Sequence, residues 1–255
     1  MPSAMRTEVA LALRVDGTVD PSIGLLQTRC LVSSPLHLVP KRQLEDTFRW
    51  IVAPMDGYIA GVVYTDGSLV DGDVDFEGTC ARLGWSFLAI NGEGNIVAAA
   101  CGRPPAWITT IYGAELWAIV MAARYAFPGG VAELVSDCES VVNDIRKGPR
   151  WATAYNRVLA RAWAAFWATT DEQAPPFEVV WMPAHIPEHA VGVARLSNGR
   201  LLTHCDRDMN AKVDRWAKEV ARSERAPLRI RDLVLHQAAA VRGCGGVDSQ
   251  RHGSG

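Results

Sequence analysis

Four carboxylates in this sequence are spaced so that they can do metal chemistry. Asp66 and Asp137 each follow an apolar run typical of a buried strand, and Glu115 and Asp214 lie within two helical patterns. An unpaired buried carboxylate is costly, and neighbouring carboxylates repel each other. Divalent cations with oxygen ligands remove both penalties. The four residues therefore predict a metal site where strands and helices meet.

A pair of such cations suits one chemistry above others. Two ions held about 4 Å apart can activate a water and stabilise the leaving oxygen of an in-line displacement at phosphorus. Because Mg²⁺ keeps several waters and takes only one or two carboxylates, four carboxylates suffice for two ions. We expect two Mg²⁺ ions per site, with Mn²⁺ as a substitute.

The hydrophobic pattern indicates which elements bring these carboxylates together. Alternating apolar residues predict a three-stranded antiparallel meander, after which the period changes from 2 to 3.6. The predicted strands are 59–65, 83–89, 96–101, 131–136 and 177–182, and the predicted helices are 109–127, 137–147, 151–169 and 206–222. Together they describe one mixed α/β sheet flanked by helices. If the first and fourth strands are neighbours, Asp66 and Asp137 lie side by side at one sheet edge.

Composition limits the class of protein. The chain has 255 residues, of which 49% are hydrophobic and 21% charged, as in an ordinary globular protein. No apolar run is long enough for a membrane span, residues 1–15 lack a signal-peptide core, and the six cysteines form no CxxC pair. We therefore expect an intracellular protein, nuclear or cytoplasmic, with reduced thiols and no membrane partner. The net charge of −2 does not by itself indicate a nucleic-acid binder.

The strength of the pattern divides the chain into three parts. Residues 1–58 contain one short possible helix over 41–52, which predicts an N-terminal extension or the remnant of an upstream domain. Residues 59–222 carry the strong pattern and are expected to form the main domain. Residues 223–255 are expected to form a C-terminal extension with a flexible tail.

Five short blocks resemble, in the same order, the motif blocks of the ribonuclease H family, type 1. Each block lies on the kind of element that the family requires, which makes the set far more specific than any single block. The resemblance covers residues 59–222 and is closest to the ribonuclease H domains attached to reverse transcriptases of retroelements. The blocks are "YTDGS" (64–68), "TIYGAELWA" (110–118), "VSDCESVV" (135–142), "WMPAH" (181–185) and "NAKVDRWAK" (210–218).

The resemblance implies a five-stranded ribonuclease H-like fold and a two-Mg²⁺ endonuclease. Asp66, Glu115, Asp137 and Asp214 would hold the ions that hydrolyse the RNA strand of an RNA–DNA hybrid, leaving 3′-hydroxyl and 5′-phosphate ends. His185 matches the mobile histidine that assists proton transfer or product release. The implied partners are an RNA–DNA hybrid and a reverse transcriptase domain upstream. The oligomeric state stays open.

The resemblance also implies contacts to the nucleic acid. The matching positions are Gly67, Ser68, Thr110, Tyr112 and Asn210. A basic handle present in some family members is absent. We expect its place to be taken by Arg146, Lys147, Arg150, Arg157 and Arg161, of which the last three are spaced 7 and 4 apart on one helical face. Tyr112 stands where a polar residue is common in the family, which bears on how RNA 2′-hydroxyls are sensed.

The sequence departs from the family between the histidine and the last aspartate. His185 precedes Asp214 by 29 residues, and the extra length, 186–204, includes the hairpin signal "SNGR" (197–200). His204, ten residues before Asp214, is a second candidate for the catalytic histidine. We favour His185 because its block ends a predicted strand.

Two other functions remain open from the sequence. The first is a catalytically inactive nucleic-acid-binding module on the same fold, and the second is a nuclease of this fold that acts on another nucleic acid. Each carboxylate alone also has an ordinary explanation, such as a turn for Asp66 or a helix N-cap for Asp137. Because all four are present, we favour the enzyme.

Overall fold

The computed structural model describes residues 14–15, 18–19, 35–75, 78–169 and 177–245, which divide between two compact units. The larger unit comprises residues 42–70 and 82–224, and the smaller one includes 71–81 and the chain from residue 225. No described helix is both long and apolar enough to cross a membrane.

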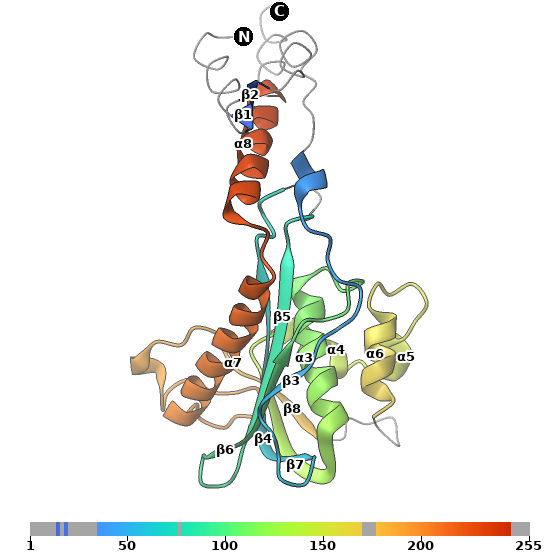
Figure 1. The fold of residues 1–255 in the computed structure, drawn as a ribbon. Coiled ribbons are helices and arrows are strands. Elements are labelled where there is room, and N and C mark those ends of the chain that lie inside the picture. The colour runs from blue at the N-terminus through green and yellow to red at the C-terminus, as the bar shows by residue number, and fades with distance from the viewer. Residues whose placement is uncertain (1–13, 16–17, 20–34, 76–77, 170–176, 246–255) are drawn as a thin grey trace, which may run out of the picture. The chain divides into compact units, whose positions relative to one another are not determined.

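The larger unit is built on a six-stranded mixed sheet with the order β3-β6-β5-β4-β7-β8 (Figure 1). β4, β5 and β6 form the predicted antiparallel meander, and β7 and β8 continue the sheet as strands parallel to β4. The predicted α/β architecture is therefore confirmed, with one strand more than the five expected. The strands are β3 (Arg49–Val52), β4 (Ile59–Val70), β5 (Arg82–Ile90), β6 (Ile96–Gly102), β7 (Ala126–Ser136) and β8 (Glu178–Trp181).

The additional strand, β3, pairs antiparallel with β6 at the edge of the sheet. The short helix expected over 41–52 was wrong, because Phe48 and Trp50 alternate along an extended chain and pack together against Tyr125. The ring centroid of Tyr125 lies 4.8 Å from that of Phe48 and 5.1 Å from that of Trp50.

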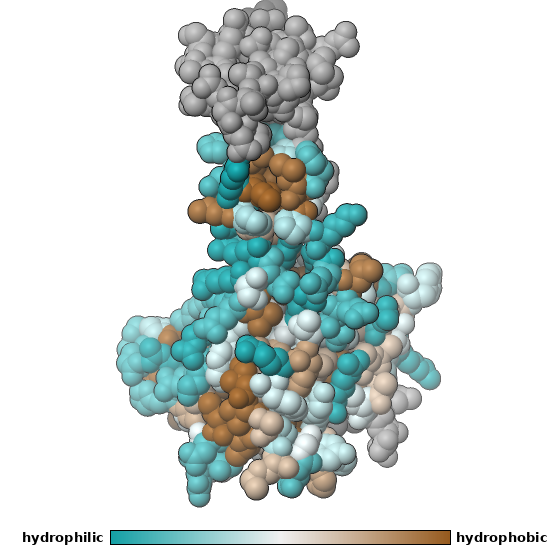
Figure 2. Space-filling view, viewed as in Figure 1, coloured by the Kyte–Doolittle hydropathy of each residue, from teal (hydrophilic) through white to brown (hydrophobic). Residues whose placement is uncertain are grey.

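The face of the larger unit seen in Figure 2 is mostly hydrophilic, with hydrophobic side chains gathered in small areas.

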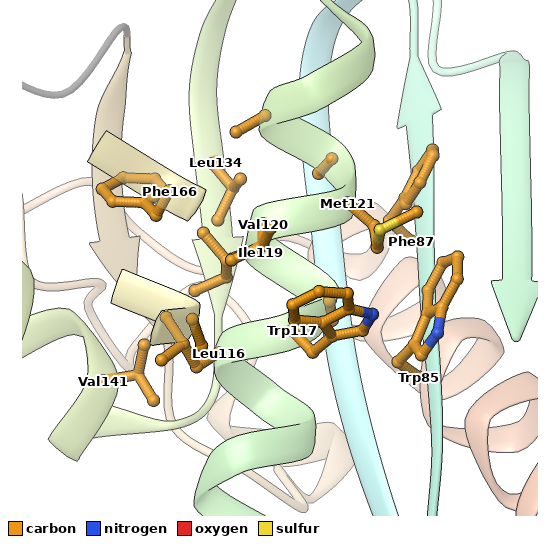
Figure 3. Close-up of a cluster of buried hydrophobic side chains, with 14 of the residues drawn as sticks. Trp85, Phe87, Leu116, Trp117, Ile119, Val120, Met121, Leu134, Val141 and Phe166 are labelled. Atoms are coloured by element: carbon orange, nitrogen blue, oxygen red, sulfur yellow. The ribbon is translucent and has the colours of Figure 1, made fainter. Parts of the chain in front are cut away.

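Helices cover both faces of this sheet (Figure 1). One face carries α3 (Ile111–Tyr125), α4 (Glu139–Ile145), α5 (Pro149–Ala152) and α6 (Ala160–Trp167), and the other carries α7 (His204–Ser223). A hydrophobic core lies on each face of the sheet. Figure 3 shows Trp117 of α3 facing Trp85 and Phe87 of β5 within the first core, between the sheet and α3. Tyr64 and Val213 belong to the second core, between the sheet and α7. Both cores position helices that carry candidate site residues.

The helix expected over 151–169 is interrupted. α5 ends at Ala152 and α6 begins at Ala160, and between them the hydroxyl of Thr153 donates to the carbonyl of Pro149 at 2.8 Å. Such a local side-chain bond competes with helix continuation. Tyr155 and Val158 fall at helical spacing with Phe166, which predicts that they pack in the core, but they are 100% and 93% exposed. Arg150, Arg157 and Arg161 consequently lie on α5, the turn and α6, rather than on one helical face as expected.

The inserted segment 186–204 is tied to the sheet through Arg200. This arginine is the last residue of the predicted turn at 197–200. It donates to both oxygens of Asp206, at 2.8 and 2.9 Å, and to Glu133 of β7 at 3.1 Å. The Tyr64 hydroxyl donates to Asp206 at 2.7 Å. These charge-assisted bonds connect the insertion, α7, β4 and β7.

The smaller unit contains α8 (Leu228–Gly245), which the sequence reading missed. Within this unit, Arg225 and Arg231 donate to Asp71, at 2.5 Å for the shortest contact. It also contains a short 3₁₀ helix, η1 (Pro35–Leu38). The tail expected to be flexible lies outside the described residues from 246 onward. The domain boundaries at 58/59 and 222/223 stay predictions.

Candidate metal centre

Parallel pairing of β4 with β7 brings Asp66 next to Asp137. Thr65 is paired with Ser136, so the next residue along each strand is one of the two aspartates. Asp66 does not end its strand, as the predicted strand 59–65 implied, because β4 continues to Val70 against β5. The expected neighbourhood of the two carboxylates is present nonetheless, at the point where β7 ends.

Asp137 is free of the helix-capping role that its position suggested. The N-cap position of α4 is Cys138 and its first helical residue is Glu139, so the predicted helix start at 137 was two residues too early. Asn210 of α7 donates from Nδ2 to Oδ2 of Asp137 at 3.1 Å, and the indole N–H of Trp181 donates to the Asp137 carbonyl at 3.1 Å. Residues from two of the sequence blocks thus hold this aspartate in place.

Close approach of α3 to β4 brings in Glu115. A Cβ atom at Gly67 would lie 2.3 Å from the backbone nitrogen of Glu115, so only glycine fits between strand and helix here. The N–H of Gly67 donates to Oε2 of Glu115 at 2.8 Å. Thr110 caps α3, its hydroxyl oxygen accepting from the N–H of Gly113 at 3.1 Å. Gly67 therefore has a packing role in addition to the substrate contact expected of it.

The substitution Gly67→Ala is expected to destabilise the fold by at least about 2 kcal/mol, because the added methyl meets backbone atoms that cannot yield cheaply. Denaturant unfolding of the full chain measures this loss. Gly92→Ala is the matched control, since its Cβ would meet nothing within 4 Å. Equal stabilities of the two variants would contradict the packing role.

Three carboxylates converge at this place. One oxygen each from Asp66, Glu115 and Asp137 lies within 4.8 Å of the other two. Asp66 and Glu115 are only 3% and 6% exposed, and Oδ2 of Asp66 is buried without a hydrogen-bond partner in the described part of the chain. A clustered, all-oxygen donor set with an unsatisfied buried oxygen fits a hard divalent cation such as Mg²⁺.

Without a cation these carboxylates oppose one another. Burial, followed by the charges of Asp137 and Asp214, raises the pKa of Asp66 to about 8. Burial and the charge of Asp66 raise the pKa of Glu115 well above its usual range, and burial raises that of Asp137. Because the pKa of all three carboxyl groups is raised, the site favours their neutral, protonated forms until a cation neutralises the negative charge.

Asp214 and His185 face the same place. A cavity of about 480 Å³ is lined by all four carboxylates together with His185. α7 reaches this position because it lies close to β5, where a Cβ at Gly84 would be 2.2 Å from the carbonyl oxygen of Ala217. His185 is exposed and has a left-handed backbone, with φ of 50°. The two carboxylate oxygens of Asp214 are contacted by Lys218, at 2.6 and 2.8 Å.

The two candidate histidines are separated. His204 is the first residue of α7, so at 1.5 Å per residue it lies about 15 Å along the helix axis from Asp214. Its Nδ1 is 3.3 Å from the carboxylate of Glu188. His185, not His204, is among the residues that line the carboxylate cavity.

The residues expected to contact nucleic acid fall into two groups. Gly67, Ser68 and Tyr112 line the carboxylate cavity, and Asn210 lines a smaller adjoining one of about 140 Å³. Thr110 is exposed at the start of α3. Arg150 and Arg157 are exposed, and neither is among the residues that line either cavity.

A basic platform adjoins the cavity, and its members are Lys147, Trp151 and Arg157. The ammonium of Lys147 lies 4.2 Å and the guanidinium of Arg157 3.6 Å from the Trp151 ring centroid. Lys147 also contacts Asp144 at 2.7 Å, and Asp144 accepts from the hydroxyl of Tyr112 at 2.5 Å. The platform is therefore connected to the wall of the carboxylate cavity.

Two features of the site were missed from the sequence. Lys218 follows Asp214 by four residues, a spacing that predicts contact on a helix and that could have revealed it. Trp151, whose helical spacing with Phe166 predicts core packing, does pack against the first core, and its ring also holds two cations that were not predicted. Trp163 and Trp167, the tryptophans of this segment that could stack on bases, are buried.

Comparison with known proteins bears on the fold. No protein-family model and no curated protein sequence matches the chain. Solved structures do match it, each with low sequence identity. The RNase H domain of PFV has 16% identity over 66% of this chain and 98% of its own, with a TM-score of 0.48. RNase H1 from the halophilic archaeon Halobacterium salinarum NRC-1 has 17% identity over 64% and 97%, with a TM-score of 0.39.

A third match is the protease-reverse transcriptase of prototype foamy virus. It has 16% identity over 68% of this chain and 22% of its own, with a TM-score of 0.45. Two of the three matches are ribonuclease H proteins and the third is a protease-reverse transcriptase, and this chain is similar to each of them at low sequence identity. The ribonuclease H resemblance itself rests on the five sequence blocks.

Proposed function

We propose that this protein is a metal-dependent endonuclease that hydrolyses the RNA strand of RNA–DNA hybrids to 3′-hydroxyl and 5′-phosphate ends. The observation that carries the proposal is the convergence of three carboxylate oxygens within 4.8 Å, one residue of which has a buried oxygen without a partner among the described residues. The five ordered sequence blocks supply the reaction and the substrate. Cleavage of labelled substrates with Mg²⁺ tests it.

In this proposal the chain's own residues hold and order the site. Asp66, Glu115, Asp137 and Asp214 would hold two Mg²⁺ ions, for which Mn²⁺ could substitute. Such ions, when bound, would supply activation of a water and stabilisation of the leaving oxygen at phosphorus. Asn210 orients Asp137 through its hydrogen bond. In the hydrolysis the attacking water loses a proton and its oxygen bonds to phosphorus, the bond from phosphorus to the 3′-oxygen breaks, and the 3′-oxygen takes up a proton.

Selection of the hybrid would rest on duplex shape and 2′-hydroxyl contacts rather than on base sequence. Ser68 and Tyr112 line the cavity where the RNA strand would lie. Because the Tyr112 hydroxyl already donates to Asp144, we assign the 2′-hydroxyl contact to Ser68 and to backbone groups beside it. By their place in the motifs, Thr110 and Asn210 would contact the strand backbone. A reverse transcriptase domain upstream is the proposed protein partner.

His185→Ala is expected to slow cleavage by about 10²-fold, because a positioned proton-transfer group is lost. His204→Ala is the matched control and is expected to retain cleavage within about twofold, since His204 lies about 15 Å along α7 from Asp214. Single-turnover cleavage of a labelled hybrid across a pH series measures both. A larger loss in the His204 variant would reverse the assignment.

The double substitution Lys147→Ala and Arg157→Ala is expected to weaken hybrid binding and to lower the salt dependence of binding by about one phosphate contact per cation. Hybrid binding with Ca²⁺ in a salt series, followed by fluorescence anisotropy, measures this. Arg150→Ala tests a further predicted cation. Arg215→Ala, which removes an exposed arginine paired with Glu219, is the control. Equal salt slopes for the double variant and the control would show that Lys147 and Arg157 do not contact phosphates of the hybrid.

A further inference from the structure

The candidate metal centre contains a cation of its own. Lys218 lines the same cavity as the four carboxylates, and its ammonium contacts both oxygens of Asp214. Among the described residues lining this cavity, no second lysine and no arginine occurs. The charge of Lys218 also counteracts the rise in the pKa of Asp66, so it acts on the centre and not only on its helix.

This ion pair occupies groups that a metal would need. Asp66, Glu115 and Asp137 present their oxygens to one another within 4.8 Å, whereas the oxygens of Asp214 face an ammonium at 2.6 and 2.8 Å. An ammonium on both oxygens uses the lone pairs that a carboxylate offers to a cation. As an i,i+4 pair about one-third exposed, the contact adds little to helix stability. Its position within the centre is therefore its notable property.

We propose that Lys218 is the resident counter-cation of Asp214 and exchanges with a divalent ion for this carboxylate. The inference rests on the proposed metal centre and names a residue that regulates it. In the free protein the ammonium neutralises Asp214, and a divalent ion has to displace it. The displaced ammonium then becomes available to a phosphate oxygen of the nucleic acid. Metal and nucleic acid consequently favour each other's binding, because coupling between two ligands is reciprocal.

The residue type suits such an exchange. Lysine is a compact, strongly hydrated charge on a flexible four-carbon stem, so it leaves a carboxylate easily. Arginine would hold the carboxylate through two parallel bonds and leave it less readily. Lysine and arginine thus carry the same charge but differ in how readily they release the carboxylate. Comparison of Lys218 with Lys218→Arg therefore distinguishes displacement of the ammonium by the metal from an effect of the positive charge alone.

Calorimetric titration of the full chain with Mn²⁺, in the absence of nucleic acid, tests the proposal. Lys218→Met is expected to bind Mn²⁺ at least about fivefold more tightly than wild type, since a repelling charge and a competitor are both removed. Lys218→Arg is expected to bind no more tightly than wild type. Lys212→Met, which removes a lysine from the same helix but outside both described cavities, is the control and is expected to match wild type. Asp66→Asn is expected to remove the heat signal.

Unchanged or weaker Mn²⁺ binding by Lys218→Met, with an unchanged melting temperature, would overturn the exchange. Lys218→Gln repeats the comparison if the Met variant does not fold. Because the titration contains no nucleic acid, it is independent of hydrolysis. A protein that shows the predicted order of affinities but cuts no nucleic acid refutes the proposed function alone. A wild-type protein that binds no Mn²⁺ overturns both.

Discussion

Asp66→Asn is expected to reduce Mg²⁺-dependent cleavage by at least about 10³-fold while leaving the fold intact. Asp66 lies among the other three carboxylates. The charges of Asp137 and Asp214 add to the effect of burial in raising the pKa of Asp66, and the charge of Asp66 in turn raises the pKa of Glu115. Replacing one carboxylate oxygen by the amide nitrogen of Asn removes a hard anionic ligand and leaves the size of the side chain almost unchanged. Transition-state stabilisation by the ions is lost with it, and about 4 kcal/mol corresponds to that factor.

The measurement is single-turnover cleavage at saturating enzyme, with a melting curve for each variant. Asp208→Asn is the matched control, because Asp208 is an exposed aspartate of α7 outside the cavity. It is expected to cut at the wild-type rate. If Asp66→Asn retained a tenth or more of the wild-type rate, Asp66 would not be a ligand of the catalytic ions.

Metal-free wild-type protein is expected to lose stability as the pH rises from about 4 to about 8. Asp66 has an ordinary pKa of 3.8 and a folded-state pKa of about 8, raised chiefly by burial. Between these values the unfolded chain has released the proton that the folded chain retains, so higher pH favours unfolding. Asp66→Asn does not titrate, and its stability is expected to exceed that of wild type at pH 8 by about 2–5 kcal/mol.

Mg²⁺ should reverse this order. An ion that binds only the folded state stabilises it by about 2.7 kcal/mol at 100 times its dissociation constant. Wild type is expected to gain this stability at pH 8, and Asp66→Asn to gain much less. Urea unfolding followed by tryptophan fluorescence, in chelator and in Mg²⁺ between pH 5 and 8, measures both effects. Parallel pH curves for the two proteins in chelator would refute the electrostatic description of the site.

The parts of the fold that could be predicted are those written in local periodicity. The meander and the strand before Asp137 alternate regularly, and parallel pairing of β4 with β7 follows once the two strands are neighbours. The N-cap Thr110 likewise marks the start of α3 in the sequence. Its predicted end at 127 was two residues too late, because β7 already begins at Ala126. The proximity of Asp66 to Asp137 was predictable for this reason.

The parts that failed depend on contacts between distant residues. β3 forms because Phe48 and Trp50 find Tyr125, more than 70 positions away, which no local pattern encodes. At the break after Ala152 the Thr153 hydroxyl donates to the Pro149 carbonyl, a bond that competes with the helix in a segment whose apolar spacing otherwise indicated one. The strand bearing Asp66 extends past it because β5 pairs along its whole length, including Asp66 with Ser86.

The site shows the same division. The four carboxylates are identified by motif and element. Lys218, which contacts Asp214, ends the fifth block but had no role predicted for it, and Trp151, which holds Lys147 and Arg157, belongs to no block. Their roles are visible only as distances. Sequence motifs therefore indicate the reaction, whereas the groups that regulate charge around it emerge from the packed structure.

The most direct test of the central claim is cleavage of an end-labelled RNA–DNA hybrid by the full chain with Mg²⁺, beside single-stranded RNA, duplex RNA and duplex DNA. We expect cutting of the hybrid's RNA strand alone, to products with 3′-hydroxyl and 5′-phosphate ends. Failure of folded, Mn²⁺-binding protein to cut the hybrid with either Mg²⁺ or Mn²⁺, or equal cutting of duplex RNA or DNA, would contradict the proposed activity.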